Sequence, residues 1–232
     1  LREAGAVAFT DGDRAVMNAL TMRRALSYAS NFDALIVQHA LDQDLQSAGV
    51  MHEGELATRL GLTGIPVAAE TAIIDRDIRL VELTGARYHI HQISSGESVE
   101  AVRQAKARGL AVSCGVSAAH LMLNENDVEN YRTFAKLNPP LRSEDDRLAL
   151  VDGLADGTID IVVSGHNPQD AEAKRQPFAQ AAYGTVGVET LLSVLLSLHN
   201  AHGLDLATLI RTVTLHPARL LDIDGGTLRA GV

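Results

Sequence analysis

Aromatic residues are scarce in this sequence of 232 residues, at 3%, and tryptophan is absent. The core must therefore be built from aliphatic side chains, as is typical of parallel sheets that are buried beneath helices. Cysteine occurs once, as Cys114, so the chain can form no internal disulfide and no thiolate zinc site. We expect a reducing compartment, the cytoplasm, and a Cys114 that is a small buried hydrophobe in a strand.

Long apolar runs and an excess of positive charge are also missing. The longest apolar stretch, 188–198, is interrupted by polar residues and is too short to span a bilayer. The sequence has 20 Lys and Arg against 29 Asp and Glu, and the resulting formal charge of -9 repels phosphate backbones and anionic lipids. The sequence therefore predicts no binding to nucleic acid or to membranes.

Short β-prone runs alternate with longer helical patterns, which predicts βα units around a parallel sheet. Strands are expected at 5–10, 34–39, 87–93, 110–116 and 159–164, and helices at 15–29, 67–83, 98–108, 144–155 and 187–201. Ser94 and Glu97 predict a capping box for the third helix, and Ser143 is the expected N-cap of the fourth. Five strands fit either an open doubly wound sheet or part of an eight-stranded barrel, and their number alone does not decide.

Polar residues gather where the predicted strands end, and in parallel α/β folds the chemistry is found at those ends. They are Asp11, Asp13, Gln38, His39, His91, Gln92, Ser117, His120, Ser164 and His166. A histidine at a strand end is a candidate metal ligand, although it can equally be satisfied by loop backbone. The Asp11-Gly12-Asp13 run fits a metal-binding loop, but it also fits an ordinary turn.

Several strings of residues, taken in order and spacing, resemble the dihydroorotases of the amidohydrolase superfamily, especially the class I type. They are FTDGDR at 9–14, IVQHALD at 36–42, EGELATRLGLTGIPVAAET at 53–71, RDIRLVELTGARYHIHQIS at 76–94, AKLNPPLRSEDDRLAL at 135–150, DGTIDIVVSGHNPQDAEAK at 156–174 and FAQAAYGTVGVETLL at 178–192. The resemblance implies an α/β fold, the eight-stranded β/α barrel of the TIM type, with a zinc centre of one or two ions at the strand ends. It also implies reversible conversion of N-carbamoyl-L-aspartate to L-dihydroorotate in pyrimidine biosynthesis.

The resemblance also implies which barrel strands are present. The predicted strand that begins at Gly5 matches the family's fourth barrel strand, so residues 1–232 are expected to form a single amidohydrolase barrel domain that lacks strands one to three and a C-terminal flanking segment. The His-x-His zinc pair of the first strand would lie in the absent part. The sequence also starts without an initiator methionine, which agrees with this expectation.

Among the metal-binding positions that the resemblance implies, only one carries the residue type that the family has there. His39 stands at the fifth-strand zinc ligand. The bridging carboxylate falls on Gly12, where Asp11 or Asp13 could stand in, and the sixth-strand histidine is replaced by Gln92. The catalytic aspartate of the eighth strand is replaced by Gly165, which carries no acid.

Two histidines stand beside the replaced positions. Adjacent strand residues point to opposite faces, so His91 and His166 are expected to stay outside the site. The resemblance assigns substrate binding to Asn138 and to the loop that ends at Gly187, where glycine permits close backbone approach.

Two interpretations remain open. The chain is either a zinc-dependent hydrolase of cyclic amides with a degraded site, or a non-catalytic homologue that acts as a structural partner of aspartate transcarbamoylase. Its expected partners are a small-molecule substrate, dihydroorotate or N-carbamoyl-aspartate, and further copies of itself in a homo-oligomer. Hydantoinases and allantoinases share the fold, so the cyclic amide itself stays undecided.

Overall fold

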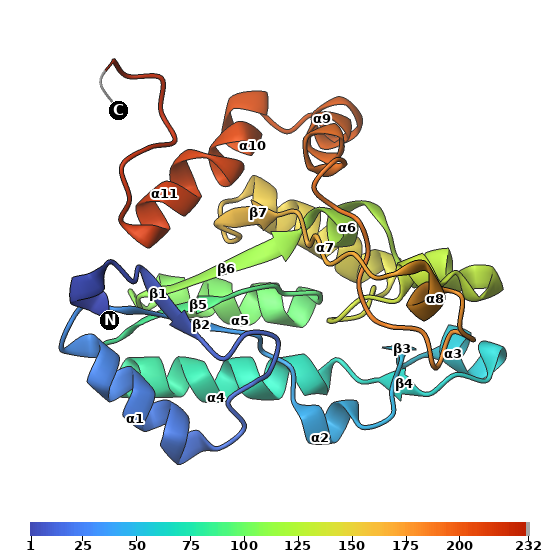
Figure 1. Ribbon diagram of the computed structural model, residues 1–232. Coiled ribbons are helices and arrows are strands. Elements are labelled where there is room, and N and C mark those ends of the chain that lie inside the picture. Colours follow the sequence, from blue (N-terminus) through green and yellow to red (C-terminus); the bar gives the residue numbers. More distant parts are fainter. Residues whose placement is uncertain (231–232) are drawn as a thin grey trace.

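The centre of the protein is a parallel sheet, seen in a computed structural model that describes residues 1–230 (Figure 1). The sheet has five strands in the order β1-β2-β5-β6-β7. Their bounds are Ala8–Thr10, Leu35–Gln38, Arg87–Ile90, Val112–Ser117 and Ile161–Val163. All five expected strands are therefore confirmed, and their ends differ from the expected ones by at most three residues.

The order of the strands confirms the β/α barrel that the resemblance implies, a choice that the number of strands alone left open. Across the sheet the strands follow one another in chain order without a reversal. A doubly wound sheet must reverse at a switch point, whereas a β/α barrel winds in one direction with its helices outside. Helices α1 (Ala19–Ser30), α4 (Ala68–Thr84), α5 (Gly96–Ala107) and α7 (Glu144–Ala155) pack against one another in that sequence along one face. The chain is thus an arc of a β/α barrel.

The predicted helices are confirmed with small shifts, but one predicted cap is wrong. Ser143 caps α7 and forms a capping box with Asp146. In α5 the cap is Ser95, whose side chain accepts from the backbone of Ser98, and not Ser94. The Ser94 hydroxyl instead donates to the buried carboxylate of Glu70. A buried charge attracts this hydroxyl more strongly than the helix terminus does.

Periodicity missed the shorter elements. A second sheet pairs β3 (Met51–His52) with β4 (Gly64–Ile65), and the short helices are α2 (Gln43–Gln46), α3 (Glu55–Leu60), α6 (Ala118–Met122) and α8 (Ala171–Lys174). Elements of two to six residues are too short to show a hydrophobic period. The fifth predicted helix is α9 (Leu191–His202), and α10 (Leu206–Val213) and α11 (Leu215–Leu221) follow it.

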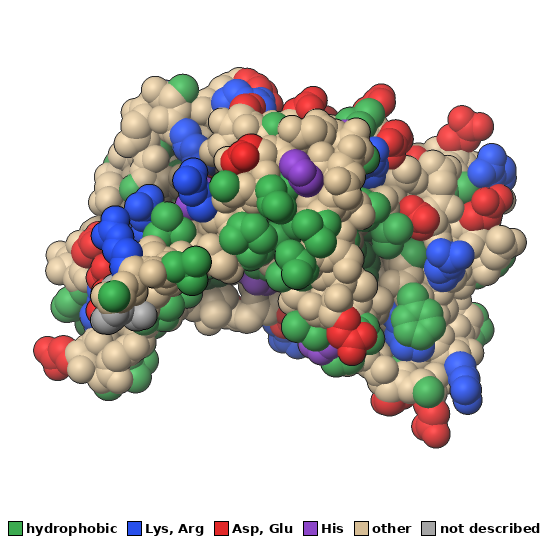
Figure 2. All heavy atoms as spheres, turned by 90° about the horizontal axis from the view of Figure 1, so that it is seen from above, with side chains coloured by type: hydrophobic (Ala, Val, Ile, Leu, Met, Phe, Trp, Pro, Cys, Tyr) green, Lys and Arg blue, Asp and Glu red, His purple; other side chains and the backbone are tan. Residues whose placement is uncertain are grey.

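The main core lies between the sheet and the outer helices and is aliphatic, as the composition predicts. Cys114 is fully buried in it as expected, and burial raises the pKa of its thiol. Figure 2 shows apolar side chains on the face seen from above, and exposed leucines of α9 include Leu192 and Leu196. Within residues 1–230 no helix is both long and apolar enough to cross a membrane.

Candidate functional site

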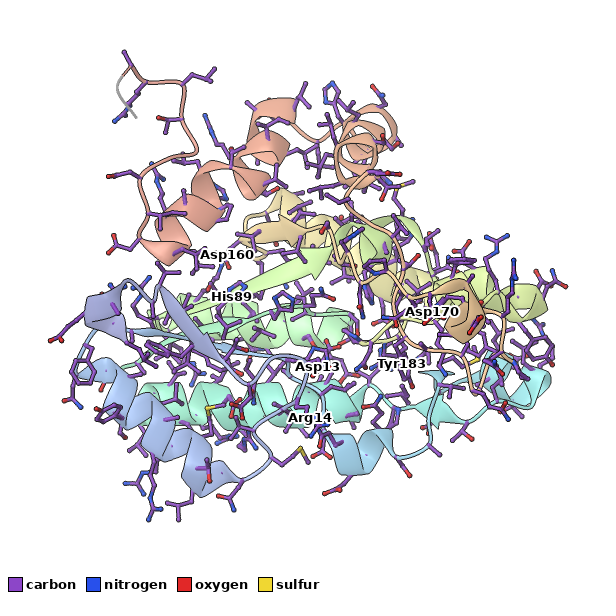
Figure 3. The ribbon with its side chains drawn as sticks, viewed as in Figure 1. Asp13, Arg14, His89, Asp160, Asp170 and Tyr183 are labelled. Atoms are coloured by element: carbon purple, nitrogen blue, oxygen red, sulfur yellow. The ribbon has the colours of Figure 1, made fainter. Side chains whose placement is uncertain are left out.

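A cavity of about 600 Å³ lies at the carboxyl ends of the central strands. Each of the five strands contributes to its wall through the residues that follow it, because parallel strands all end at the same side of a sheet. Figure 3 shows Asp13 and Tyr183 on this side, whereas His89 and Asp160 lie toward the other end of the strands. The cavity is therefore where most of the strand-end residues of the sequence come together, with the exception of Asp11 and Gln38.

His39, the first residue after β2, lines the cavity with an exposed fraction of 6%. Burial and the nearby His91 lower the pKa of its imidazole, so the ring is neutral near pH 7. Its Nε2 atom has no hydrogen-bond partner within residues 1–230. The side chain of Gln38, the residue before it, is held in place because its amide donates to Asp77 Oδ2 at 3.3 Å. His39 thus lines the cavity as a neutral imidazole with one buried nitrogen that has no partner in the described part of the chain.

Asn138 lines the same cavity and, like His39, has a buried polar atom without a partner. Its Oδ1 is buried and lacks a partner in the described part of the chain. The segment that follows it is held by two contacts. His120 Nε2 lies 3.1 Å from the carbonyl oxygen of Pro139, and the buried Arg142 guanidinium donates to the carbonyl of Ile65 at 2.6 Å. The amide oxygen of Asn138 is therefore held in place while unsatisfied.

His91 and Gln92 both line the cavity, which corrects the expectation that only one of two neighbouring residues could do so. That expectation applied strand alternation to residues outside the strand. Strand β5 ends at Ile90, and beyond it the backbone no longer alternates. The two side chains approach each other, with Gln92 Nε2 3.4 Å from His91 Nε2. Burial lowers the pKa of His91, which favours its neutral form.

Gly165 lines the cavity after β7, in the position where the resemblance implies an aspartate. Its φ of +60° lies in the left-handed region, which L side chains rarely adopt. A Cβ atom built on it would lie 3.0 Å from Ser117 Cβ. His166 lines the cavity as well, again contrary to expectation, because β7 ends at Val163. The backbone here is shaped for glycine.

The loop after β1 places Gly12 and Asp13 in the cavity wall, and Asp11 is not among the lining residues. Asp13 is therefore the nearer of the two carboxylates that could stand in at Gly12. The Thr10 hydroxyl accepts a hydrogen bond from the Gly12 backbone at 3.0 Å, which is the geometry of a turn. Gly12 has a φ of +74°, as a turn glycine commonly does.

The loop before α9 forms the far wall, as the resemblance implies, but through Tyr183, Gly184 and Thr185. Gly187 does not line the cavity. A Cβ at Gly187 would lie 2.1 Å from the carbonyl oxygen of Ser164, so glycine permits close approach to the residue after β7 rather than to a ligand. Gln169 also lines the cavity and was missed by the sequence analysis. Gln169 could have been predicted, because it lies two residues after Asn167 in the 156–174 segment that carries the resemblance.

Zinc is the group that the resemblance implies for this cavity, and the residues present fit it poorly. His39 offers a neutral, unpartnered nitrogen, which suits a metal. Within residues 1–230, however, no three His, Cys, Asp or Glu side chains come together so as to hold a metal ion. Gln92 and Gly165 supply neither imidazole nor carboxylate at their positions. By itself the described chain does not form a zinc centre.

Comparisons with known proteins agree with the fold. A family model described as dihydro-orotase-like matches residues 1–98. The dihydroorotase of Ehrlichia canis is 44% identical over 232 residues, which are 100% of this chain and 52% of that protein. The dihydroorotase of Anaeromyxobacter dehalogenans is 46% identical over 233 residues, or 54% of its length.

Among solved structures, an L-hydantoinase (dihydropyrimidinase) from Arthrobacter aurescens superposes with a TM-score of 0.84 at 26% identity. The match covers 99% of this chain and 55% of that one. The chain spans about half the length of the curated relatives that it matches. On the family model, on identity along the whole sequence and on the shared barrel arc, the chain belongs to the dihydroorotase-like family of amidohydrolases.

Proposed function

We propose that this chain is the part of a dihydroorotase-type cyclic amidohydrolase that holds barrel strands four to eight, and that its cavity binds a dihydropyrimidine ring. The associated reaction is the reversible conversion of N-carbamoyl-L-aspartate to L-dihydroorotate in pyrimidine synthesis, in the cytoplasm. Zinc would supply the attacking hydroxide in such an enzyme. Because the described residues do not complete a zinc centre, their own contribution is to bind and orient the ring.

The proposal depends on two residues of the cavity wall that each carry a buried polar atom without a partner. His39 Nε2 and Asn138 Oδ1 both lack a hydrogen bond within residues 1–230. A buried polar atom left unsatisfied costs about 1–3 kcal/mol, so a ligand that pairs with both gains affinity. A cyclic amide carries N–H donors beside carbonyl oxygens on a rigid ring, and this pattern suits two neutral partners.

Binding of L-dihydroorotate, measured by isothermal titration calorimetry, tests this proposal. We expect saturable binding to the 232-residue chain, weakened about tenfold by Asn138→Ala, because the variant loses one buried hydrogen bond. His199→Ala is the matched control, since His199 is exposed on α9 and does not line the cavity. Equal affinities for wild type and Asn138→Ala, or an absence of binding, would contradict the proposal. Tighter binding of hydantoin than of dihydroorotate would reassign the ring.

The replaced positions support a second candidate function. Gly12, Gln92 and Gly165 stand where the resemblance implies a bridging carboxylate, a zinc ligand and the catalytic acid. A chain with these residues fits a non-catalytic homologue that assembles with aspartate transcarbamoylase. If that is its role, elemental analysis of the purified protein should find well below one zinc per subunit, and full occupancy would refute it. Co-expression with a transcarbamoylase should give one shared size-exclusion peak, and separate elution would exclude the assembly.

A further inference from the structure

His166 has an arrangement of hydrogen bonds that fixes where its proton lies. Its Nδ1 faces two backbone N–H groups, those of Gly187 at 3.2 Å and of Val188 at 3.3 Å. An imidazole nitrogen accepts a hydrogen bond only when it carries no proton itself. The neutral ring must therefore carry its proton on Nε2.

The two donors are held rigidly in front of the ring. Gly187 is pressed against the end of β7, where an added Cβ would lie 2.1 Å from Ser164 O and 3.3 Å from the His166 backbone nitrogen. The chain segments around them also pair, since Asn167 donates its backbone N–H to Thr185 O at 2.9 Å. Rotation of the imidazole would break two hydrogen bonds that the loop could not easily replace. The orientation of His166 is thus set by the loop.

The other nitrogen, Nε2, is free for a ligand. His166 is exposed and lines the cavity, and within residues 1–230 its Nε2 makes no hydrogen bond. Beside it, Gly165 has no side chain that could compete for the same space. The cavity therefore offers one fixed N–H donor here, in addition to the unsatisfied atoms of His39 and Asn138.

We propose that His166 is a specificity-determining residue, which directs an Nε2–H donor into the cavity and selects ligands with a carbonyl or carboxylate oxygen at that point. The choice of ligand rests on the proposed function. The same arrangement prevents Nε2 from acting as a metal ligand, because a coordinating nitrogen must be unprotonated. His166 therefore takes over the space beside Gly165 as a hydrogen-bond donor and does not replace a zinc ligand.

The tautomer can be measured without any ligand. Long-range ¹H–¹⁵N correlation spectra of the labelled 232-residue chain distinguish a protonated from an unprotonated ring nitrogen, and His166→Asn assigns the signal by its loss. We expect the His166 Nε2 to be protonated and Nδ1 unprotonated. A proton on Nδ1, or an even mixture of the two forms, would overturn the proposal whatever the protein binds.

Two variants then separate the pocket donor from the loop anchor. His166→Gln can place an amide N–H near the position of Nε2, whereas His166→Asn keeps an acceptor near Nδ1 but does not reach the cavity. With L-dihydroorotate as the probe in calorimetry, we expect His166→Asn to weaken binding about fivefold to tenfold and His166→Gln to stay within about twofold. Wild-type affinity in His166→Asn, or an equal loss in both variants, would refute the donor role. If even the wild type does not bind the probe, the proposed function fails, and the tautomer measurement still decides the arrangement of His166.

Discussion

Restoring an aspartate at position 165 is the most direct test of how far this site has been remodelled. The structure predicts that Gly165→Asp destabilises the protein instead of repairing it. Gly165 has a φ of +60°, and a left-handed backbone costs a non-glycine residue about 1–2 kcal/mol. In addition, the new Cβ would lie 3.0 Å from Ser117 Cβ, closer than ordinary contact. Crowding of this kind typically costs about 1–3 kcal/mol. The expected loss is therefore about 2–5 kcal/mol.

Gly157 provides a matched control for the backbone contribution. Its φ is +80°, but a Cβ built there meets nothing within 4 Å. Gly165→Ala and Gly157→Ala therefore share the conformational cost and differ in the contact with Ser117. In urea unfolding monitored by circular dichroism, we expect Gly157→Ala to lose about 1–2 kcal/mol and Gly165→Ala at least about 1 kcal/mol more. Equal losses at both positions would refute the reasoning and would show that the cavity has room for an acid at 165.

The remaining predictions concern buried charge and pH. Glu70→Gln should lower the free energy of unfolding by about 2–3 kcal/mol, because the buried carboxylate accepts from Ser94 and Ser98 and a neutral amide holds them less strongly. The exposed Glu100→Gln is the control and should change the free energy of unfolding by less than about 0.5 kcal/mol. Equal effects of the two variants in urea titrations would contradict the role of Glu70. Stability should also fall in acid, because burial lowers the pKa of His89 to about 3 from the ordinary 6.5. A lowered pKa in the folded state means that the unfolded chain binds more protons between those two values, so stability is complete above about pH 6.5 and is lost as the pH falls toward 3. From pH 7 to pH 5 the expected loss from this residue is about 2 kcal/mol, and an unchanged slope of stability against pH in His89→Gln would refute it.

The sequence predicted the central sheet because its strands are apolar runs of ordinary length between helical patterns. The number and pattern of the strands could not choose between barrel and open sheet, since that choice depends on the order of strands in space, and the barrel was predicted from the family resemblance alone. These patterns also missed β3, β4 and the short helices, whose few residues show no periodicity. Tertiary contacts decided the cap of α5, where Glu70 binds the hydroxyl of Ser94 and leaves Ser95 as the cap.

In the candidate site, too, the predictions based on local sequence position succeeded and those that depended on the three-dimensional course of the backbone failed. Strand-end position correctly brought His39, Gln92 and Gly165 to one cavity, and Asn138, which was predicted from the resemblance, lines the same cavity. Alternation failed for His91 and His166, because both follow the last paired residue of their strands. Gly187 was assigned for the right physical reason, close backbone approach, but its neighbour is Ser164 and not a ligand.

The replaced positions and the barrel arc together support the proposed binding cavity, in which the catalytic groups that the resemblance implies are absent from the described residues. The unsatisfied buried atoms of His39 and Asn138 lower the stability of the fold, and only a ligand that pairs with them would offset this free-energy cost. The segment that follows Asn138 is held by Arg142 and His120, two buried side chains whose hydrogen bonds serve to position it. Gly165 adds to this argument, because its left-handed backbone and the contact with Ser117 exclude a side chain where the resemblance implies an acid. The described cavity wall carries the carboxylate of Asp13 but glycine at position 165, and under the proposed function this suits recognition of a cyclic amide better than its rapid cleavage.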